Sequence, residues 1–164
     1  MQEEFTFNKQ TVQIAVIDQS GMMITSSKML YPKTPVDLSD REHFRVHAST
    51  DVDRLFISQP LLGRASNQWS VQFTRPYRTA EGKFAGVVVV SLDPEFLTRS
   101  FSSINLGAGG GLALVGDDGI VRAGAGIYRD LLGKTLPPPS GSATHVNAAA
   151  GVDVEIEMSG DAPL

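Results

Sequence analysis

The chain has 164 residues, of which 41% are hydrophobic, enough for one ordinary domain or two small lobes. Acidic residues outnumber basic ones by 18 to 14, and the net charge of −4 argues against a nucleic-acid partner, because phosphate binding needs clustered basic charge. Cysteine is absent, which excludes disulfides and thiolate metal sites, and no window approaches the roughly 18 apolar residues that a membrane-spanning helix needs.

The first predicted element is a β-hairpin. Residues 11–18 alternate as a strand, the turn signal at 18–21 follows, and residues 22–25 form the return strand. One face of the first strand carries three branched side chains, Val12, Ile14 and Val16. Residues 28–38 contain two prolines and are expected to be irregular.

A helix is predicted to begin after Ser39. Ser39 and Glu42 match a capping box, with serine at the N-cap and glutamate at the third helical position. One face of this helix carries residues at helical spacing: Arg41, Phe44, Arg45 and Ala48. Phe44 and Ala48 are expected to turn that face inward, which carries Arg41 toward the interior.

The longest hairpin is predicted at residues 68–93, after a short strand at 55–58. The first strand alternates, with Trp69, Val71 and Phe73 on one face and Ser70, Gln72 and Thr74 on the other. After a turn at 80–82, the strand at 84–92 contains four consecutive valines and is expected to be central and covered on both faces.

A second helix and a second hairpin complete the pattern. Asp93 and Pro94 favour a helix start, as N-cap and first helical residue. Glycines at 107–111 indicate a hinge, strands are predicted at 112–115 and 120–123, and residues 152–158 alternate as a final strand.

The sequence offers no assembled catalytic or metal centre. His43 and His47 lie four residues apart, a spacing that can bind zinc, but the HExxH pattern and a third ligand are absent. We therefore expect them to be surface or rim histidines. No nucleophile, base and orienting group come together in any recognisable motif, so we predict no enzyme activity, no metal and no cofactor.

The arginines are more informative. Six of the nine lie between residues 41 and 78, and no acidic residue occurs from 55 to 80. Arg75 shares its predicted strand face with Trp69 and Phe73. Two arginines aimed at one partly apolar cavity, Arg41 and Arg75, would suit a carboxylate or another small anion. The alternative is structural pairing of the arginines with Asp40, Glu42 or Asp51.

Five segments follow one another in an order that resembles a known family. They are DLSDREHF at 37–44, FIS at 56–58, WSVQFTR at 69–75, GKFAGVV at 82–88 and SLD at 91–93. This series, over about the first two-thirds of the chain, resembles the Cache (PDC, PAS-like) extracytoplasmic sensor domains of bacterial diguanylate cyclases and sensor histidine kinases. The family's long N-terminal helix is missing and its second lobe is incomplete, which suits an excised fragment.

The resemblance implies an α+β fold. A PAS-like central antiparallel sheet, of five strands, would carry a helix–loop lid in a ligand-binding lobe at residues 1–106, followed by a partial second lobe at 107–164. Family members that sense amino acids hold the ligand's ammonium group with an aspartate whose position here is Ser91, and Arg41 matches the family's carboxylate-facing arginine. We therefore expect a small carboxylate rather than an amine, bound by Arg41, Phe44, Trp69, Phe73, Arg75 and Ser91.

The implied function is sensing. The domain would be the periplasmic, extracytoplasmic portion of a membrane-anchored protein, and ligand binding would signal to a cytoplasmic diguanylate cyclase or histidine kinase. A homodimer is a further expectation, and no nucleic acid is expected as a partner. The alternative is a sensor-shaped module without a ligand that acts through dimerisation or partner contact, and a hydrolase is a more distant third.

Overall fold

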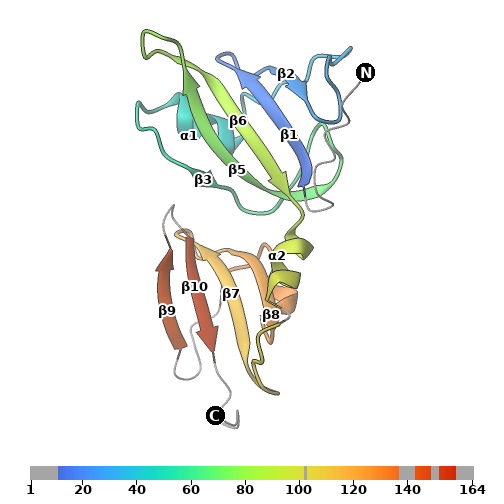
Figure 1. Cartoon of the computed structure of the whole chain (residues 1–164), viewed down its shortest axis with the longest axis vertical. Coiled ribbons are helices and arrows are strands. Elements are labelled where there is room, and N and C mark those ends of the chain that lie inside the picture. Colours follow the sequence, from blue (N-terminus) through green and yellow to red (C-terminus); the bar gives the residue numbers. More distant parts are fainter. Residues whose placement is uncertain (1–10, 102, 137–142, 149–151, 158–164) are drawn as a thin grey trace.

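The structure is a computed structural model that describes residues 11–101, 103–136, 143–148 and 152–157, the last two ranges as backbone alone. Two antiparallel sheets follow one another along the chain (Figure 1). The first has the order β2-β1-β6-β5-β3, with β4 also paired to β5, and the second has the order β8-β7-β10-β9. Two sheets and two helices confirm the predicted α+β class, with β4 added to the five expected strands.

The strands of the first sheet are β1 (Thr11–Asp18), β2 (Met23–Ser26), β3 (Phe56–Ile57), β4 (Leu61–Leu62), β5 (Trp69–Arg78) and β6 (Phe84–Leu92). The helices are α1 (Glu42–Ala48), α2 (Pro94–Ser100) and the 3-10 turn η1 (Arg129–Leu131). The second sheet contains β7 (Gly111–Gly116), β8 (Val121–Gly126), β9 (Ala143–Ala148) and β10 (Val152–Glu157).

Strand β6 is the centre of the first sheet, as predicted. It pairs with both β1 and β5, and Val90 lies opposite Ile14 on one side and Phe73 on the other. Gly86 permits this close pairing, because a Cβ atom at that residue would lie 2.0 Å from the carbonyl oxygen of Ile17. Its φ of 149° also lies in the region that favours glycine.

The prediction that β6 is covered on both faces is wrong for the outer face. Val87 and Val89 are buried beneath α1, whereas Val88 on the other face is 38% exposed. The valine run reflects strand propensity as well as burial. Strand β1 is similar: Val12, Ile14 and Val16 are only half-buried, and the face that turns inward carries Ala15 and Ile17.

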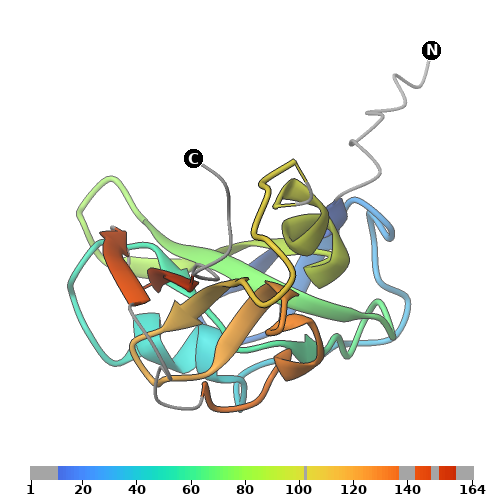
Figure 2. The ribbon, with the colours of Figure 1, turned by 90° about the horizontal axis from the view of Figure 1, so that it is seen from below.

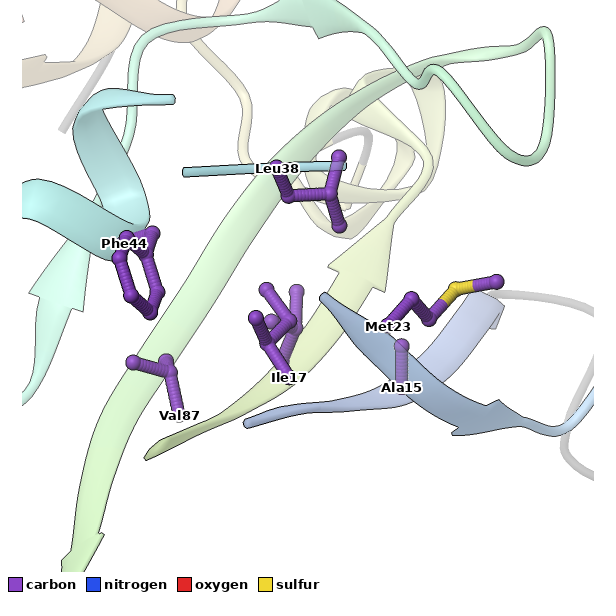
Figure 3. Close-up of a cluster of buried hydrophobic side chains, with 7 residues drawn as sticks. Ala15, Ile17, Met23, Leu38, Phe44 and Val87 are labelled. Atoms are coloured by element: carbon purple, nitrogen blue, oxygen red, sulfur yellow. The ribbon is translucent and has the colours of Figure 1, made fainter. Parts of the chain in front are cut away.

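The hydrophobic core of the first sheet lies between its inner face and α1 (Figure 3). Phe44 of α1 meets Phe84 edge-to-face, with ring centroids 5.9 Å apart. The buried members of the cluster come from β1, β2, the loop before α1, α1 itself and β6: Ala15, Ile17, Met23, Leu38, Phe44, Val87 and Val89. Phe44 therefore anchors the helix over the sheet.

Helix α1 begins at Glu42, two residues later than the capping-box pattern predicts. Arg41 is the N-cap residue and makes no side-chain cap. The Ser39 N–H instead donates to Asp37 Oδ1 at 2.9 Å, so residues 37–39 form a local turn before the helix. The buried face consequently carries His43, Phe44 and His47, and the predicted face through Arg45 and Ala48 is wrong.

Helix α2 connects the two sheets, and its predicted start is confirmed. Asp93 Oδ1 accepts a hydrogen bond from the Glu95 N–H at 2.9 Å, and Pro94 is the first helical residue. The helix contacts both β5 and β8. In the view along the long axis of the molecule, α1 and α2 lie on opposite sides of the first sheet (Figure 2).

The second sheet contains the predicted hairpin as β7 and β8 and the predicted last strand as β10, which pairs with β7 and β9. Strand β9 was not predicted. The alternation predicted for the side chains of residues 152–158 lies outside what the structure describes. The division into a lobe at 1–106 and a second at 107–164 stays a prediction.

The two helix starts give a matched stability prediction. We expect Asp93→Ala to lower the free energy of unfolding by about 0.5–2 kcal/mol, the usual range for a lost N-cap. Ser39→Ala should leave it nearly unchanged, because the Ser39 side chain caps no helix. Chemical denaturation of both variants measures the difference, and an equal loss in the two would contradict this assignment of the helix starts.

Candidate ligand-binding site

A cavity of about 30 Å³ lies between α1 and the inner face of the first sheet. It has room for only one or two water molecules in this structure. Strands β1, β5 and β6 form its floor, and the segments at 38–43 and 61–66 form its rim. Its lining combines apolar residues, among them Ala15, Met23, Leu38, Leu61 and Val89, with polar ones, among them Gln13, Arg41, His43, Arg64, Gln72 and Ser91.

The two arginines at the rim differ in their partners. Arg64 is held by Asp40 through two hydrogen bonds of 2.8 and 2.9 Å, and it also donates to the Asp37 carbonyl. Arg41 has a buried Nε with no hydrogen-bond partner. No carboxylate is found among the described residues that line the cavity. Arg41 therefore brings to the cavity a guanidinium group with one unpaired nitrogen, and Asp40 lies near enough for the two charges to interact.

The β5 side of the cavity is a buried polar wall. Ser91 Oγ donates to Gln72 Oε1, and Gln72 Nε2 donates to Ser70 Oγ at 2.7 Å. The Gln72 N–H donates to Ser58 Oγ at 3.0 Å. All four residues are buried. Because both ends of the Gln72 amide are bound, its orientation is fixed, and the wall presents preset hydrogen-bonding groups to the cavity.

The two histidines of α1 are buried, so the expectation of surface or rim histidines is wrong. His43 lines the cavity, and His47 Nε2 lies 2.9 Å from Thr74 Oγ1 on β5. Burial, with the nearby Arg41 charge, lowers the pKa of His43 to about 4, and burial also lowers the pKa of His47. Both are therefore neutral at pH 7. In the described part of the chain, no three metal-ligating side chains are grouped.

An open groove of about 600 Å³ borders the other side of Arg41. It is lined by two acidic and two basic residues at 40–42 and 45, by residues 59–62 and by Trp69, whose side chain is largely exposed at 61%. Arg41 and Leu61 belong to both the groove and the cavity. The arginine therefore stands at the boundary between a small enclosed space and the outer surface.

Solved structures with the same arrangement of elements are sensor domains. The extracellular domain of a proposed histidine kinase, rpHK1S-Z16, matches with a TM-score of 0.68 at 25% identity, over 93% of this chain and 72% of that one. The ligand-binding domain of the amino acid chemoreceptor PctC of Pseudomonas aeruginosa PAO1, in complex with GABA, matches with a TM-score of 0.64 at 21% identity, over 94% and 76%.

A third match is the ligand-binding domain of the Pseudomonas fluorescens chemoreceptor CtaA in complex with L-isoleucine. Its TM-score is 0.70 at 17% identity, over 98% of this chain and 73% of that one. The chain has the fold of a Cache-type sensor domain. No protein-family model matches the sequence, and no curated protein matches it either. Among the described residues, no helix is long and apolar enough to cross a membrane.

The Cache-type fold brings together only part of the predicted site. Arg41 and Ser91 line the cavity, and Phe44 packs in the core beside it. Trp69 faces the groove, whereas Phe73 and Arg75 are absent from the lining of both. The reason is the orientation of β5, which turns Ser70, Gln72 and Thr74 toward α1. Whether Arg41, Phe44 or Ser91 binds a ligand stays a prediction.

Arg75 illustrates the correction. It lies on the outer, exposed face of β5, where its guanidinium makes two hydrogen bonds of 2.8 and 3.1 Å to Asp53. Arg78 similarly pairs with Asp51 at 3.4 Å. The alternative of structural pairing therefore holds for Arg64, Arg75 and Arg78. It does not hold for Arg41.

Among the polar lining residues that the sequence interpretation missed are Gln13, His43 and Gln72. A signal for Gln72 was available, because Ser91 lies directly opposite it in the register of β5 and β6. Once Ser91 is placed at the site, its cross-strand neighbour belongs there as well. Gln13 and His43 carried no comparable signal, since each depends on how β1 and α1 face the sheet.

The buried His43 predicts a pH dependence of stability. Its pKa of about 4 lies below the ordinary 6.5, so the unfolded chain binds a proton more readily than the folded one between these values. Stability should be fully present above pH 6.5 and fall as the pH drops toward 4. Since each tenfold difference in proton affinity is about 1.4 kcal/mol, the loss should approach roughly 3 kcal/mol.

Urea denaturation at several pH values measures this loss. His43→Gln should remove the part of the dependence between pH 6.5 and 4 that comes from His43 and leave the contribution of His47. The groups around His43 act in opposite directions: Arg41 and His47 lower its pKa, and Asp40 raises it. A dependence of equal size in the variant and the native protein would show that His43 is not buried in its neutral form.

Proposed function

We propose that this domain senses a small carboxylate, which binds to Arg41 in the cavity under α1. The observation that carries the proposal is the buried Nε of Arg41, which has no partner beside a cavity without a carboxylate. A buried guanidinium group is stable when a negative group meets it, and a carboxylate matches its geometry in two parallel hydrogen bonds. The ligand would supply the missing hydrogen-bond partner of this nitrogen.

The charge of the lining supports an anion over a zwitterion. The neighbours PctC and CtaA were solved with GABA and L-isoleucine, which carry an ammonium group as well as a carboxylate. Here the polar wall is neutral, and Ser91 stands where the family resemblance places an ammonium-binding aspartate. An ammonium group in this cavity would lose hydration without meeting a negative charge, which is unfavourable.

The size of the site narrows the ligand class. A ligand with two or more carboxylates would need a second free arginine, and Arg75 does not supply one because it lies outside the cavity and is paired with Asp53. With Arg41 as the one unpaired arginine of the lining and about 30 Å³ of space, we propose a short monocarboxylate of the size of acetate or propionate. A small movement of α1 would admit a few further atoms.

The small cavity also favours a second candidate, a sensor-shaped module that binds no ligand and acts through dimerisation or partner contact. Its basis is that side chains already fill most of the space beneath α1. In either case we propose that the domain has no enzyme activity and works as a homodimer. The similarity to ligand-binding domains supports the first of these statements.

We further propose that the domain is the extracytoplasmic part of a membrane-anchored protein with a cytoplasmic output domain, such as a histidine kinase or a diguanylate cyclase. Support comes from the neighbours, which include an extracellular domain of a proposed histidine kinase and ligand-binding domains of chemoreceptors. A ligand would act on the output by binding one conformation of the domain more tightly than another.

Two matched pairs of compounds test the ligand class. Acetate and glycine differ by the amine alone, and so do propionate and alanine. We expect isothermal titration calorimetry to show binding of the two acids and little binding of the amino acids. Arg41→Gln should weaken the acids by roughly tenfold or more, the expected effect of losing hydrogen bonds to a charged group.

Arg129→Gln is the control, because it removes an exposed arginine of η1 that lines neither the cavity nor the groove. It should bind the acids as the native protein does. Preference for glycine and alanine would overturn the anion assignment. Binding that survives Arg41→Gln would overturn the role of Arg41, and no binding by any of the four compounds would favour the ligand-free module.

A further inference from the structure

Arg122 on β8 is a buried charge around which the second hairpin is built. Its side chain is only 4% exposed. The guanidinium makes two hydrogen bonds to Asp118, at 2.7 and 3.0 Å, and one to the Ile120 carbonyl at 2.8 Å. Gly116 leaves the space for it, since a Cβ atom at that residue would lie 2.5 Å from Arg122 Cζ.

The same guanidinium reaches the first sheet. Arg122 Nη2 donates to the carbonyl oxygen of Ile57 on β3, at a distance of 3.4 Å. Next to this bond is a cavity of about 520 Å³, lined by Arg122 and Asp118 from the second hairpin, by residues of β3 and by Glu42. The two sheets therefore leave an open space beside this bond, while the guanidinium itself stays buried.

Strand β3 leads from this bond to the candidate ligand site. Ser58 follows Ile57 and is fully buried. It is joined to Gln72 in both directions, because its N–H donates to the Gln72 carbonyl at 2.9 Å and its Oγ accepts from the Gln72 N–H at 3.0 Å. Gln72 lines the cavity and holds Ser91. Arg122 is thus connected to the cavity wall through Ile57, Ser58 and Gln72.

We infer that Arg122 is a positioning residue for the ligand cavity, although it belongs to the other sheet. It holds β3 at the spacing that keeps Ser58 bonded to Gln72, and it thereby ties the cavity wall to the second sheet. Any coupling of this kind is reciprocal: a change at the cavity also alters the bond at Arg122. The inference rests on the proposed function only in naming this cavity a ligand site.

Amide hydrogen exchange of the whole 164-residue chain, read by NMR without any ligand, tests the inference directly. Arg122→Lys keeps the charge but loses the planar fork that reaches Asp118 and Ile57 together. We expect the amides of Ser58 and Gln72 to exchange roughly tenfold faster, as expected when a hydrogen bond to a charged group is lost. Arg129→Lys, at an exposed arginine of η1, is the matched control and should change neither amide.

Gly116→Ala provides a second variant, in case the lysine variant folds poorly. The φ of Gly116 is not in the region reserved for glycine, so the added methyl group should displace the side chains of Arg122 and Asp118 rather than the backbone of the hairpin. Faster exchange of Ser58 and Gln72 in this variant supports the inference. Faster exchange confined to residues 116–126, or an equal effect of Arg129→Lys, overturns it and limits Arg122 to a structural role in its own sheet.

Acetate binding is measured separately with the same variants. If acetate binds the native protein, its affinity should fall severalfold in Arg122→Lys and stay unchanged in Arg129→Lys. If acetate does not bind the native protein, the proposed ligand class fails, while the exchange experiment still decides the role of Arg122. Unchanged acetate affinity in a folded Arg122→Lys protein, with faster exchange at Ser58, would exclude coupling to the cavity.

Discussion

The inner face of β5 presents hydroxyl and amide groups where a packed sheet usually presents hydrocarbon, and the arrangement under α1 depends on this. Burying such groups is unfavourable unless each finds a partner. Thr74 meets His47, and Gln72 meets Ser70, Ser91 and Ser58. The His47–Thr74 contact ties the helix to β5, and the bonds of Gln72 hold β5 to β6 and to the residue after β3.

The opposite side of the same face is apolar, and the contrast locates the cavity. Phe44 packs with Ile17, Val87 and other core residues of β1 and β6, and each such side chain contributes roughly 1.5–3 kcal/mol on burial. The cavity lies where this cluster meets the polar wall, so Val89 and Ser91, two residues apart on β6, both line it. A ligand with an apolar part and a polar part fits such a boundary.

Local signals in the sequence were sufficient for most elements of the fold. Alternation and turn residues predict β1, β2, β5, β6 and the second hairpin, and Asp93 with Pro94 predicts α2, because each signal acts within a few residues. Local signals do not predict which face of β5 turns inward. The Trp69, Val71 and Phe73 set is more hydrophobic, and only the complementary polar groups on α1 and β6 select the other set.

Only part of the candidate site was predictable from the sequence. Arg41 and Ser91 came from their positions in a family pattern, and both line the cavity. Ser39 has the right spacing for a cap, but its N–H donates to Asp37, and the helix begins only at Glu42. The buried face of the helix therefore carries His43 and His47. The sequence pattern does not show whether the Ser39 N–H bonds to Asp37 or takes part in a capping box, and the two histidines were for this reason predicted at the surface.

Three ion pairs attach the chain on either side of α1 to the rest of the first sheet. Asp40 pairs with Arg64, Asp51 with Arg78 and Asp53 with Arg75, and the three aspartates are largely exposed. Dissolved salt screens such pairs over about 8–10 Å at physiological concentrations. The segment around α1, which covers the cavity, is therefore held less firmly at high ionic strength than at low ionic strength. A domain on the proposed outer side of a membrane would meet both, and the strength of this attachment would follow the ionic strength of its surroundings.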